Sequence, residues 1–456
     1  FCRLVVASIN VSLLSRLFSV VAYFLKLQQG GKSEKMAPNN NKNYNADELE
    51  APAWLNDEFF TKVLLNFETD AKDLQLRKTE LSPATLKGDH YASVMFRATV
   101  EYKCDGEVKT KRMIMKIMPS QEGHKKEMFE ESTIFETEIG MYTKVIPRFE
   151  QILRDIGDDT VLKAPILFYE LSPRKIIIFE DIVPLGYEVL RGRCVNNEEI
   201  KLAYLKLAKW HAISYKINFE EPEYFESYRQ GLLTMPKIEE NVFMSQAIDL
   251  LIQQVETMPR LQNYLPHLKS IRNKLFKGAI NSFKEYQEAR KANAYYVLCH
   301  GDFHNKNMMF KHDPSSGKLL DVMLLDYQLS YVGPMINDLI YSYYMLLDSE
   351  HREDFPQWMY FYFTHFKETL QKIGFEGPLP KLVDLHEQRT QQKYFELFLL
   401  ITFLPAWMAF RDGDTGPDEI MSSDDTRKQI YARTDFLEEL EKLLPKYLHL
   451  GYFEDD

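Results

Sequence analysis

The chain has 456 residues, of which 45% are hydrophobic and 13% aromatic, and its formal net charge is −11. This length and composition predict a folded protein with two domains or lobes and argue against wholesale disorder. The negative charge argues against a nucleic-acid binder, which needs a basic face. The four cysteines (Cys2, Cys104, Cys194 and Cys299) fit neither a metal-ligand spacing nor a disulfide framework, which favours a reducing cytosol.

The N-terminal segment differs from the rest of the chain. Residues 4–25 are mostly apolar and flanked by basic residues, a pattern typical of a signal peptide or a membrane anchor. However, the chain starts with Phe, and Met36 opens a polar, Asn-rich segment. We therefore expect Met36 to be the native start and residues 1–52 to be a spurious or disordered extension. A real membrane anchor is the alternative.

From residue 53 onward the pattern predicts a small antiparallel sheet with one long helix. Apolar residues at helical intervals predict a first helix over 53–67. Alternating residues predict strands over 92–102 and 112–118, joined by a turn at Cys104-Asp105-Gly106. A long helix over 125–145 and strands over 160–169 and 175–180 complete this part.

After Pro184 the pattern becomes mainly helical. Helices are predicted over 198–215, 242–257, 268–292, 357–373 and 391–410. The apolar run 398–404 is too short to span a bilayer, so the last of these helices is expected to be buried. The Gly/Asp/Ser-rich stretch 411–426 is expected to be a mobile loop.

The segment from His300 to Asn307, His-Gly-Asp-Phe-His-Asn-Lys-Asn, carries the clearest chemistry. Asp302, Asn307 five positions later, and Asp326 at the end of the strand-like run 319–327 follow the order Asp-x-x-x-x-Asn, strand, Asp. Protein kinases have this order in their catalytic loop and metal-binding aspartate. The carboxylate of Asp302 is suited to receive a hydroxyl proton, and oxygen atoms of Asn307 and Asp326 are suited to hold Mg²⁺.

A lysine stands within an apolar strand, in Ile114-Met115-Lys116-Ile117-Met118. Burying its ammonium is costly unless the group has a partner. Phosphates of ATP and a helix glutamate are the partners that a kinase provides. The family resemblance given below implies Glu138 as this glutamate, and Glu136, about 200° away on the helical wheel, is the competing candidate.

Together these motifs resemble the ecdysteroid kinase-like family, a branch of the choline kinase and aminoglycoside phosphotransferase group, over residues 53–450. The resemblance implies an α+β, bilobal protein kinase-like fold, with an ATP-binding N-lobe over 53–183 and a C-lobe over 184–456 that holds the catalytic loop and the substrate pocket. It also implies ATP and Mg²⁺ as cofactors.

The resemblance assigns further residues to nucleotide binding. Gly88 and Ser93 correspond to the loop that covers the phosphates, and backbone groups of Glu180 and Ile182 to the hinge that carries the adenine. Gln328 stands where protein kinases have glycine, as in small-molecule kinases that lack a regulated activation loop.

Several neighbouring residues are expected to be structural. His300 is expected to hold the catalytic loop by hydrogen bonding. Asp338 is expected to cap a helix or to bond to the catalytic loop. The pair Trp210-His211 is expected to pack in the core. For His304, a solvent-side position beside phosphate and a substrate contact both stay open.

The resulting hypothesis is a cytoplasmic, monomeric ATP-dependent kinase, without nucleic acid or firm membrane association as partners. Its acceptor is a small hydroxylated molecule, an ecdysteroid or a hydroxylated xenobiotic, and aromatic residues of the C-lobe suit an apolar pocket. A choline or ethanolamine kinase, with an aromatic box and the nearby Asp412 and Asp414, is the second hypothesis. A catalytically silent ligand-binding pseudokinase is the third.

Overall fold

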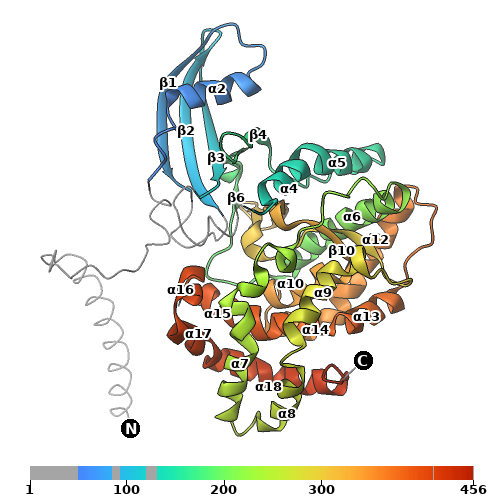
Figure 1. Ribbon diagram of the computed structural model, residues 1–456. Coiled ribbons are helices and arrows are strands. Elements are labelled where there is room, and N and C mark those ends of the chain that lie inside the picture. The colour runs from blue at the N-terminus through green and yellow to red at the C-terminus, as the bar shows by residue number, and fades with distance from the viewer. Residues whose placement is uncertain (1–49, 85–92, 120–130, 414, 455–456) are drawn as a thin grey trace, which may run out of the picture. The chain divides into compact units, whose positions relative to one another are not determined.

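The computed structural model describes residues 50–84, 93–119, 131–413 and 415–454, all of which belong to the unit Tyr44–Asp456. In this part of the chain the predicted α+β class is confirmed, because a five-stranded antiparallel sheet precedes a larger, mainly helical region (Figure 1). The apolar segment 4–25, Gly88 and residues 125–130 of an expected helix lie outside the described residues.

The five-stranded sheet has the order β1-β2-β3-β5-β4. Its strands are β1 (Leu74–Pro83), β2 (Val94–Cys104), β3 (Glu107–Ile117), β4 (Ile166–Glu170) and β5 (Ile176–Glu180). Strand β2 alternates between buried and half-buried residues, as a strand with one core-facing side does. The predicted turn between β2 and β3 has Asp105 and Gly106 at φ 50° and 94°, the left-handed values that a tight hairpin turn requires.

The first helix, α2 (Asp57–Phe67), begins later than the predicted residue 53 because Asn56 is its N-cap. The Asn56 side chain accepts a hydrogen bond from the amide of Phe59 at 3.0 Å. Phe59 and Phe60 of α2 share one apolar core with the inner residues of the sheet. The helix therefore covers one face of the sheet.

The predicted long helix starts, in its described part, at α4 (Ile134–Gly140) and continues through a π-helical turn (Met141–Val145) into α5 (Ile146–Asp155). It therefore extends past the expected end at residue 145. Its buried residues, such as Phe135 and Ile139, belong to the core of the helical region and not to the core of the sheet. The helix that carries Glu138 is thus fixed to the helical region of the protein.

The helical region contains more helices than the sequence predicted. Its helices are α6 (Asn197–Glu220), α7 (Val242–Glu256), α8 (Leu265–Ile271), α9 (Leu275–Glu288), α10 (Ile336–Met345), α11 (Ser349–Glu353), α12 (Phe355–Lys372), α13 (Leu382–Gln391), α14 (Lys393–Phe398), α15 (Leu404–Asp412), α16 (Pro417–Ser422), α17 (Asp424–Tyr431) and α18 (Thr434–His449). The single helix predicted over 268–292 is two helices, α8 and α9.

The expectation of a mobile loop over 411–426 was wrong. The polar residues there begin helices: Pro417 is the first residue of α16, and the Ser423 hydroxyl caps α17 by accepting from the amide of Thr426 at 3.1 Å. Arg427 then donates to the carbonyl of Ile420 at 2.7 Å, which ties the two helices together. Turn-forming composition was misread because the same residues favour helix starts.

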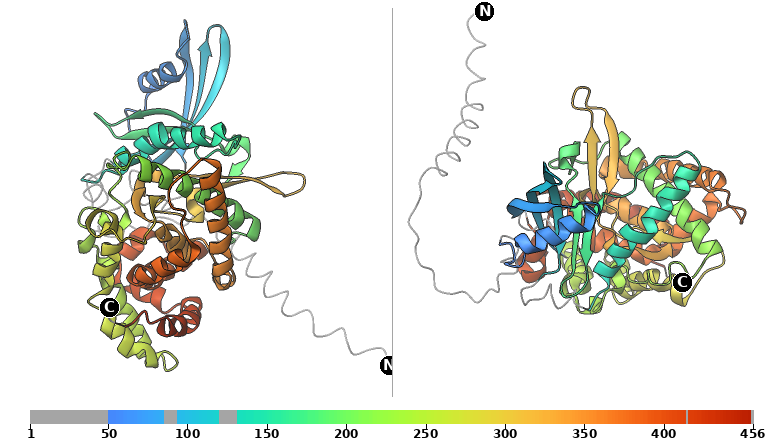
Figure 2. Two further views of the ribbon diagram at one scale, coloured as in Figure 1. Left: turned by 90° about the vertical axis from the view of Figure 1, so that its right-hand side faces the viewer. Right: turned by 90° about the horizontal axis from the view of Figure 1, so that it is seen from above.

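Two small sheets position the catalytic segment. Strands β7 (Tyr296–Cys299) and β10 (Tyr331–Pro334) pair in one, and β6 (Tyr187–Glu188), β8 (Met308–His312) and β9 (Leu319–Leu324) form the other. Figure 2 shows the hairpin of β8 and β9 projecting from the helical region. Asp302 lies between β7 and β8, and Asp326 follows β9, so both acidic residues stand at strand ends.

One helix among the described residues, Lys393–Asp412, is long and apolar enough to cross a membrane, with a mean hydropathy of 1.4, and 78% of this stretch is buried inside the protein. It comprises α14, a second π-helical turn (Leu399–Phe403) and α15. The predicted burial of this helix is confirmed.

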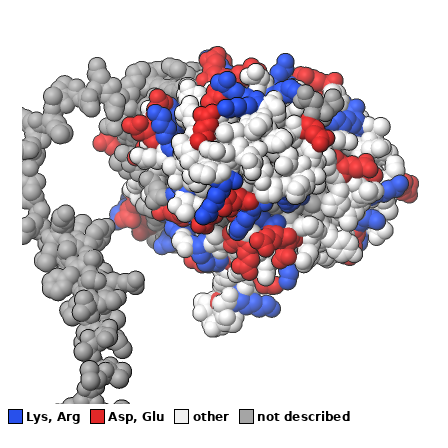
Figure 3. Space-filling view, turned by 90° about the horizontal axis from the view of Figure 1, so that it is seen from below, with Lys and Arg blue, Asp and Glu red and all other residues white. Residues whose placement is uncertain are grey.

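On the face drawn in Figure 3, acidic and basic side chains are interspersed. Ion pairs between exposed side chains also occur, as between Lys269 and Glu256 at 2.8 Å. Exposed pairs of this kind contribute little to stability.

Candidate active site

Lys116 of β3 is almost fully buried and contacts two carboxylates. Its Nζ lies 2.5 Å from Oε2 of Glu138 and 2.8 Å from Oδ1 of Asp326. Burial alone would lower the pKa of Lys116, but the charges of Asp326 and Glu138 raise it. The ammonium therefore stays charged and joins the sheet, α4 and the segment after β9 at one point.

The competing glutamate, Glu136, points elsewhere. It pairs with Lys175 at 2.9 Å, and its side chain is largely exposed. Glu138, which is 2% exposed, is the glutamate that contacts Lys116. The two residues differ by two positions on a helix and so face different sides.

Asp326 adopts the left-handed conformation, with φ 62° and ψ 66°. Few residues other than glycine adopt this conformation without a compensating contact, and such strain is frequent at functional sites. Its Oδ1 contacts Lys116 at 2.8 Å, and its Oδ2 accepts a hydrogen bond from Nε2 of Gln328 at 3.3 Å. Gln328 is buried, and among the described residues its Oε1 has no hydrogen-bond partner.

The carboxylate of Asp302 is held by three side chains. Tyr341 donates to Oδ1 at 2.5 Å, Nε2 of His304 lies 3.3 Å from the same oxygen, and Nδ2 of Asn307 donates to Oδ2 at 2.9 Å. Burial alone would raise the pKa of Asp302, but the charge and hydrogen bond of His304 and the hydrogen bond from Tyr341 lower it to about 2. The group is therefore an oriented carboxylate.

Asn307 is oriented by its amide nitrogen, which donates both to the carbonyl of Asp302 at 3.1 Å and to its carboxylate. Its side-chain oxygen makes neither bond. The backbone carbonyl of Asn307 accepts from the amide of Leu325 at 2.9 Å, so Asn307 lies beside the residue that precedes Asp326. Among the described residues, no group of three or more His, Cys, Asp or Glu side chains could hold a metal ion. Asp326 and Asn307 instead provide a carboxylate oxygen and an amide oxygen, which are the kind of donors that Mg²⁺ prefers.

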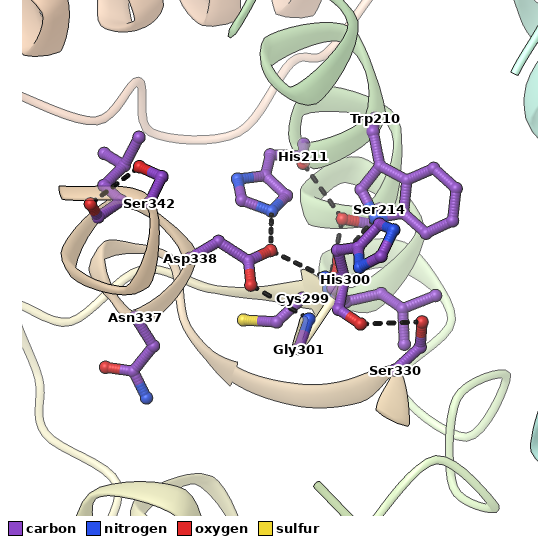
Figure 4. Close-up of polar contacts among 12 residues, drawn as sticks. Trp210, His211, Ser214, Cys299, His300, Gly301, Ser330, Asn337, Asp338 and Ser342 are labelled. Carbon is purple, nitrogen blue, oxygen red and sulfur yellow. Dashed lines mark hydrogen bonds and ion pairs between the residues drawn. The ribbon is translucent and has the colours of Figure 1, made fainter. Parts of the chain in front are cut away.

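Asp338 holds the catalytic loop from α10, as Figure 4 shows. Its Oδ2 accepts from the amide of His300 at 2.6 Å and its Oδ1 from the amide of Gly301 at 2.9 Å. Nε2 of His211 lies 3.0 Å from the same Oδ2. Asp338 is in the first turn of α10 and is not its N-cap, so of the two expected roles the bond to the loop is the one observed.

The loop also depends on Gly301 and His300. Gly301 has φ 83°, and a Cβ atom there would lie 2.1 Å from the carbonyl oxygen of Leu329, so no other residue fits. Nε2 of His300 donates to the carbonyl of Leu325 at 3.1 Å, and burial lowers its pKa, which favours the neutral ring. His300 thereby links the loop to the residue before Asp326.

The expected hinge lies at the end of β5. Glu180 pairs with Lys111 at 2.7 Å and Asp181 with Arg97 at 2.9 Å, so both carboxylates are tied to the sheet. Ile182 is buried, and no described residue accepts a hydrogen bond from its amide. A small apolar cluster surrounds it, formed by Ala164, Ile182, Met309 and Met323.

The expected phosphate-covering loop is described only at its end. Ser93 is buried and directly precedes β2. Met95, two residues further, is the register partner of Lys116 on β3. Ser93 is therefore near the strand position of Lys116, and Gly88 lies outside the described residues.

Sequence reasoning missed Tyr341 and left His304 undecided, although both contact Asp302. A signal for Tyr341 was present: it follows Asp338 by three positions, which places both on one face of α10. Nδ1 of His304 accepts from the amide of Lys306 at 3.1 Å, so the ring is fixed. The side chain packs against Trp407, with ring centroids 5.1 Å apart.

A buried lysine paired with a helix glutamate, and a loop aspartate that contacts Asn307 next to the strand end before Asp326, form the arrangement expected of kinase-like small-molecule phosphotransferases. The model of the ecdysteroid kinase-like family matches residues 87–375, more than half of the chain. The protein belongs to this family.

The chain is also similar to solved structures, which include those of three small-molecule kinases. An ethanolamine kinase of Plasmodium vivax is 14% identical, with 85% of this chain and 91% of that chain covered and a TM-score of 0.36. The choline kinase LicA of Streptococcus pneumoniae is 13% identical, with 84% and 99% covered and a TM-score of 0.36. An aminoglycoside 2'-phosphotransferase-IIIa is 13% identical, with 84% and 99% covered and a TM-score of 0.37. The comparison with curated proteins found no significantly similar sequence.

Proposed function

We propose that the protein is an ATP-dependent kinase that transfers the γ-phosphate to an alcohol group of an ecdysteroid or a hydroxylated xenobiotic. The observation that carries the proposal is the carboxylate of Asp302. It is ionised, oriented by three side chains, and connected through Asn307 and Leu325 to the strand end that presents Asp326 to Lys116.

The proposed nucleotide site combines charged and apolar groups. Lys116, positioned by Glu138, would contact the phosphates, and Gly88 and Ser93 would cover them. Backbone groups of Glu180 and Ile182 would bind the adenine. Among the described residues no group accepts a hydrogen bond from the amide of the buried Ile182, which supports this assignment, because a buried N–H without a partner is costly unless a ligand satisfies it.

The carboxylate of Asp326 and the side-chain oxygen of Asn307 would hold Mg²⁺. When bound, the cation would neutralise charge on the phosphates. The contact between Asp326 and Lys116 supports this role, because it brings the metal-binding carboxylate and the phosphate-binding ammonium into one site.

Asp302 would orient the acceptor hydroxyl and take its proton. The hydroxyl oxygen forms a bond to the γ-phosphorus while the bond between that phosphorus and its bridging oxygen breaks, and ADP leaves with the bonding pair. A carboxylate with a pKa of about 2 is a weak base. Its main contribution is therefore orientation, with proton transfer late in the reaction.

The choline-type alternative requires an acidic group near aromatic side chains. Asp412 stands at the end of α15, but Arg411 binds one of its oxygens at 2.8 Å and Arg433 the other at 2.5 Å. Asp414 lies outside the described residues. The pairing of Asp412 disfavours a quaternary ammonium ligand.

The cytoplasmic location and the monomeric state stay predictions.

A phosphate-transfer screen by mass spectrometry tests the function. The purified protein is incubated with Mg-ATP and 20-hydroxyecdysone, choline or plant phenolic glycosides. A mass gain of one phosphate on a neutral hydroxylated compound is expected. A gain on choline alone would establish the second hypothesis. If no hydroxylated compound gains phosphate and ATP is not hydrolysed, the pseudokinase hypothesis holds.

A further inference from the structure

We propose that Gln328 belongs to the metal site: its Oε1 accepts a hydrogen bond from a water molecule in the hydration shell of Mg²⁺, while its Nε2 holds the carboxylate of Asp326. The inference deepens the proposed function and rests on it, since it takes Asp326 as a ligand of Mg²⁺. Gln328 is thus a positioning residue, because its side chain acts through Asp326 and through water.

Gln328 stands in the short 3₁₀ turn Tyr327–Leu329, which directly follows Asp326. The turn packs against α4, the helix that carries Glu138. It also packs against the catalytic loop, because a Cβ atom on Gly301 would lie 2.1 Å from the carbonyl oxygen of the last residue of the turn. The backbone that carries the Gln328 side chain is therefore held from two sides.

The two ends of the Gln328 side chain have different surroundings. Nε2 donates to Oδ2 of Asp326 at 3.3 Å, while the other oxygen of this carboxylate contacts Lys116 at 2.8 Å. Gln328 is only 7% exposed, and its buried Oε1 has no hydrogen-bond partner among the described residues. The opposite orientation of the amide would place Oε1 against a carboxylate oxygen, and two acceptors repel each other. An unpaired acceptor thus belongs to the same amide group that holds Asp326.

A buried acceptor of this kind is costly unless a ligand or a water molecule satisfies it. Mg²⁺ gives up its water reluctantly and keeps several water molecules when one or two carboxylates bind it. The hydrogens of these molecules need acceptors, and groups that surround the metal ligands of proteins commonly provide them. With Asp326 and Asn307 as the protein ligands, Oε1 of Gln328 is such an acceptor.

A neutral amide also fits the charge of the site. Lys116 already contacts two carboxylates, those of Glu138 at 2.5 Å and of Asp326 at 2.8 Å. A carboxylate in place of the Gln328 amide would add a third negative charge and could not donate to Asp326. The amide both donates and accepts without adding charge.

Magnesium titrations on the full chain test this assignment. Calorimetry measures the affinity for a non-hydrolysable ATP analogue at a series of Mg²⁺ concentrations, which gives the Mg²⁺ concentration at half of the full effect. Gln328→Met keeps the length of the side chain but removes the donor and the acceptor. It should raise this concentration by about 10-fold to 100-fold. Its affinity for the analogue without Mg²⁺ should equal that of the wild type.

Gln388→Met is the matched control. Gln388 on α13 is also buried, and neither end of its amide has a partner among the described residues. It makes no contact with Asp326, so its replacement should leave the Mg²⁺ dependence unchanged. A shift equal to that of Gln328→Met would show a general effect of altering the core and would overturn the assignment.

Gln328→Glu separates the two ends of the side chain. It keeps an acceptor for water but cannot donate to Asp326, and its charge attracts the cation, so it should need no more Mg²⁺ than the wild type. If Gln328 served only to orient Asp326, this variant would instead be as impaired as Gln328→Met.

Two results would overturn the role of Gln328. One is a Gln328→Met variant with the Mg²⁺ dependence of the wild type. The other is a Gln328→Glu variant that needs about ten times more Mg²⁺ than the wild type, and this result decides the matter even if Gln328→Met does not fold. A wild-type protein that binds the analogue no more tightly with Mg²⁺ than without it would instead overturn the proposed function, so the two failures are distinguishable.

Discussion

Tyr341 donates a hydrogen bond to Asp302, with 2.5 Å between the phenol oxygen and Oδ1. The two residues are far apart in the sequence, and α10 brings them together. The same helix holds the backbone of the catalytic loop through Asp338. One helix therefore fixes both the path of the loop and the orientation of its carboxylate.

Tyr341→Phe should lower kcat by about 10-fold to 100-fold, since a hydrogen bond to a charged group contributes roughly 1.5–3 kcal/mol. Burial raises the pKa of Tyr341, so the hydroxyl is a neutral donor, and its removal takes one hydrogen bond from the Asp302 carboxylate without changing the charge of the site. Nucleotide affinity should be unchanged. Steady-state kinetics and calorimetry check this, and an unaltered kcat would show that His304 and Asn307 suffice to orient Asp302.

Asp302→Asn should leave nucleotide affinity nearly intact and lower turnover by roughly 10²–10⁴. The substitution keeps the size of the side chain but removes the proton acceptor. Asp313→Asn, in the exposed turn between β8 and β9, is the control and should retain full turnover. Turnover of the Asp302 variant within a factor of two of wild type would remove Asp302 from the reaction.

Glu138→Gln and Glu136→Gln form a matched pair on one helix. Loss of the buried Glu138 carboxylate should weaken nucleotide binding and lower the free energy of unfolding by about 3–5 kcal/mol, the cost of breaking a buried pair. Glu136 makes a largely exposed pair with Lys175, so its variant should change stability by at most about 1 kcal/mol. Thermal unfolding and nucleotide titration are the measurements; equal effects of the two variants would contradict the assignment.

Asp338→Ala should destabilise the protein and reduce kcat. It leaves two buried amides, those of His300 and Gly301, without an acceptor, at about 1–3 kcal/mol each. Denaturant unfolding and kinetics test this. Asp354→Ala, at the start of α12, is a control that removes an aspartate outside the loop. A stable Asp338 variant with normal kcat would show that the loop holds its conformation unaided.

The buried Glu396 should make stability depend on pH. Burial alone would raise the pKa of Glu396, but the charge and hydrogen bond of Arg389 lower it. A lowered folded-state pKa gives stability that is present above the unfolded-state value of about 4.3 and is lost as the pH falls further. Glu396→Gln should cost about 3–5 kcal/mol at neutral pH, and the difference from wild type should shrink below about pH 4. Thermal melts across pH check this, and a difference independent of pH would contradict it.

The sequence by itself determined the fold class and singled out the residues that we propose for the reacting centre. Asp302, Asn307 and Asp326 are recognisable because their spacing reflects local structure, a loop followed by a hairpin. Lys116 is recognisable because a lysine in an apolar strand needs a partner. Reading elements from the sequence pattern failed for the stretch 411–426, where turn-forming residues begin helices. It also failed for the helix predicted over 268–292, which is two helices in the structure.

The tertiary structure decided which glutamate contacts Lys116, what holds Asp302, and which aromatic side chains lie beside it. Glu136 and Glu138 have the same chemistry, and only the packing of α4 separates the buried one from the exposed one. Tyr341 and Trp407 reach the catalytic loop from helices far along the chain. Contacts of this kind depend on how helices pack against one another. The local sequence pattern predicts where a helix forms but not which distant helix it packs against.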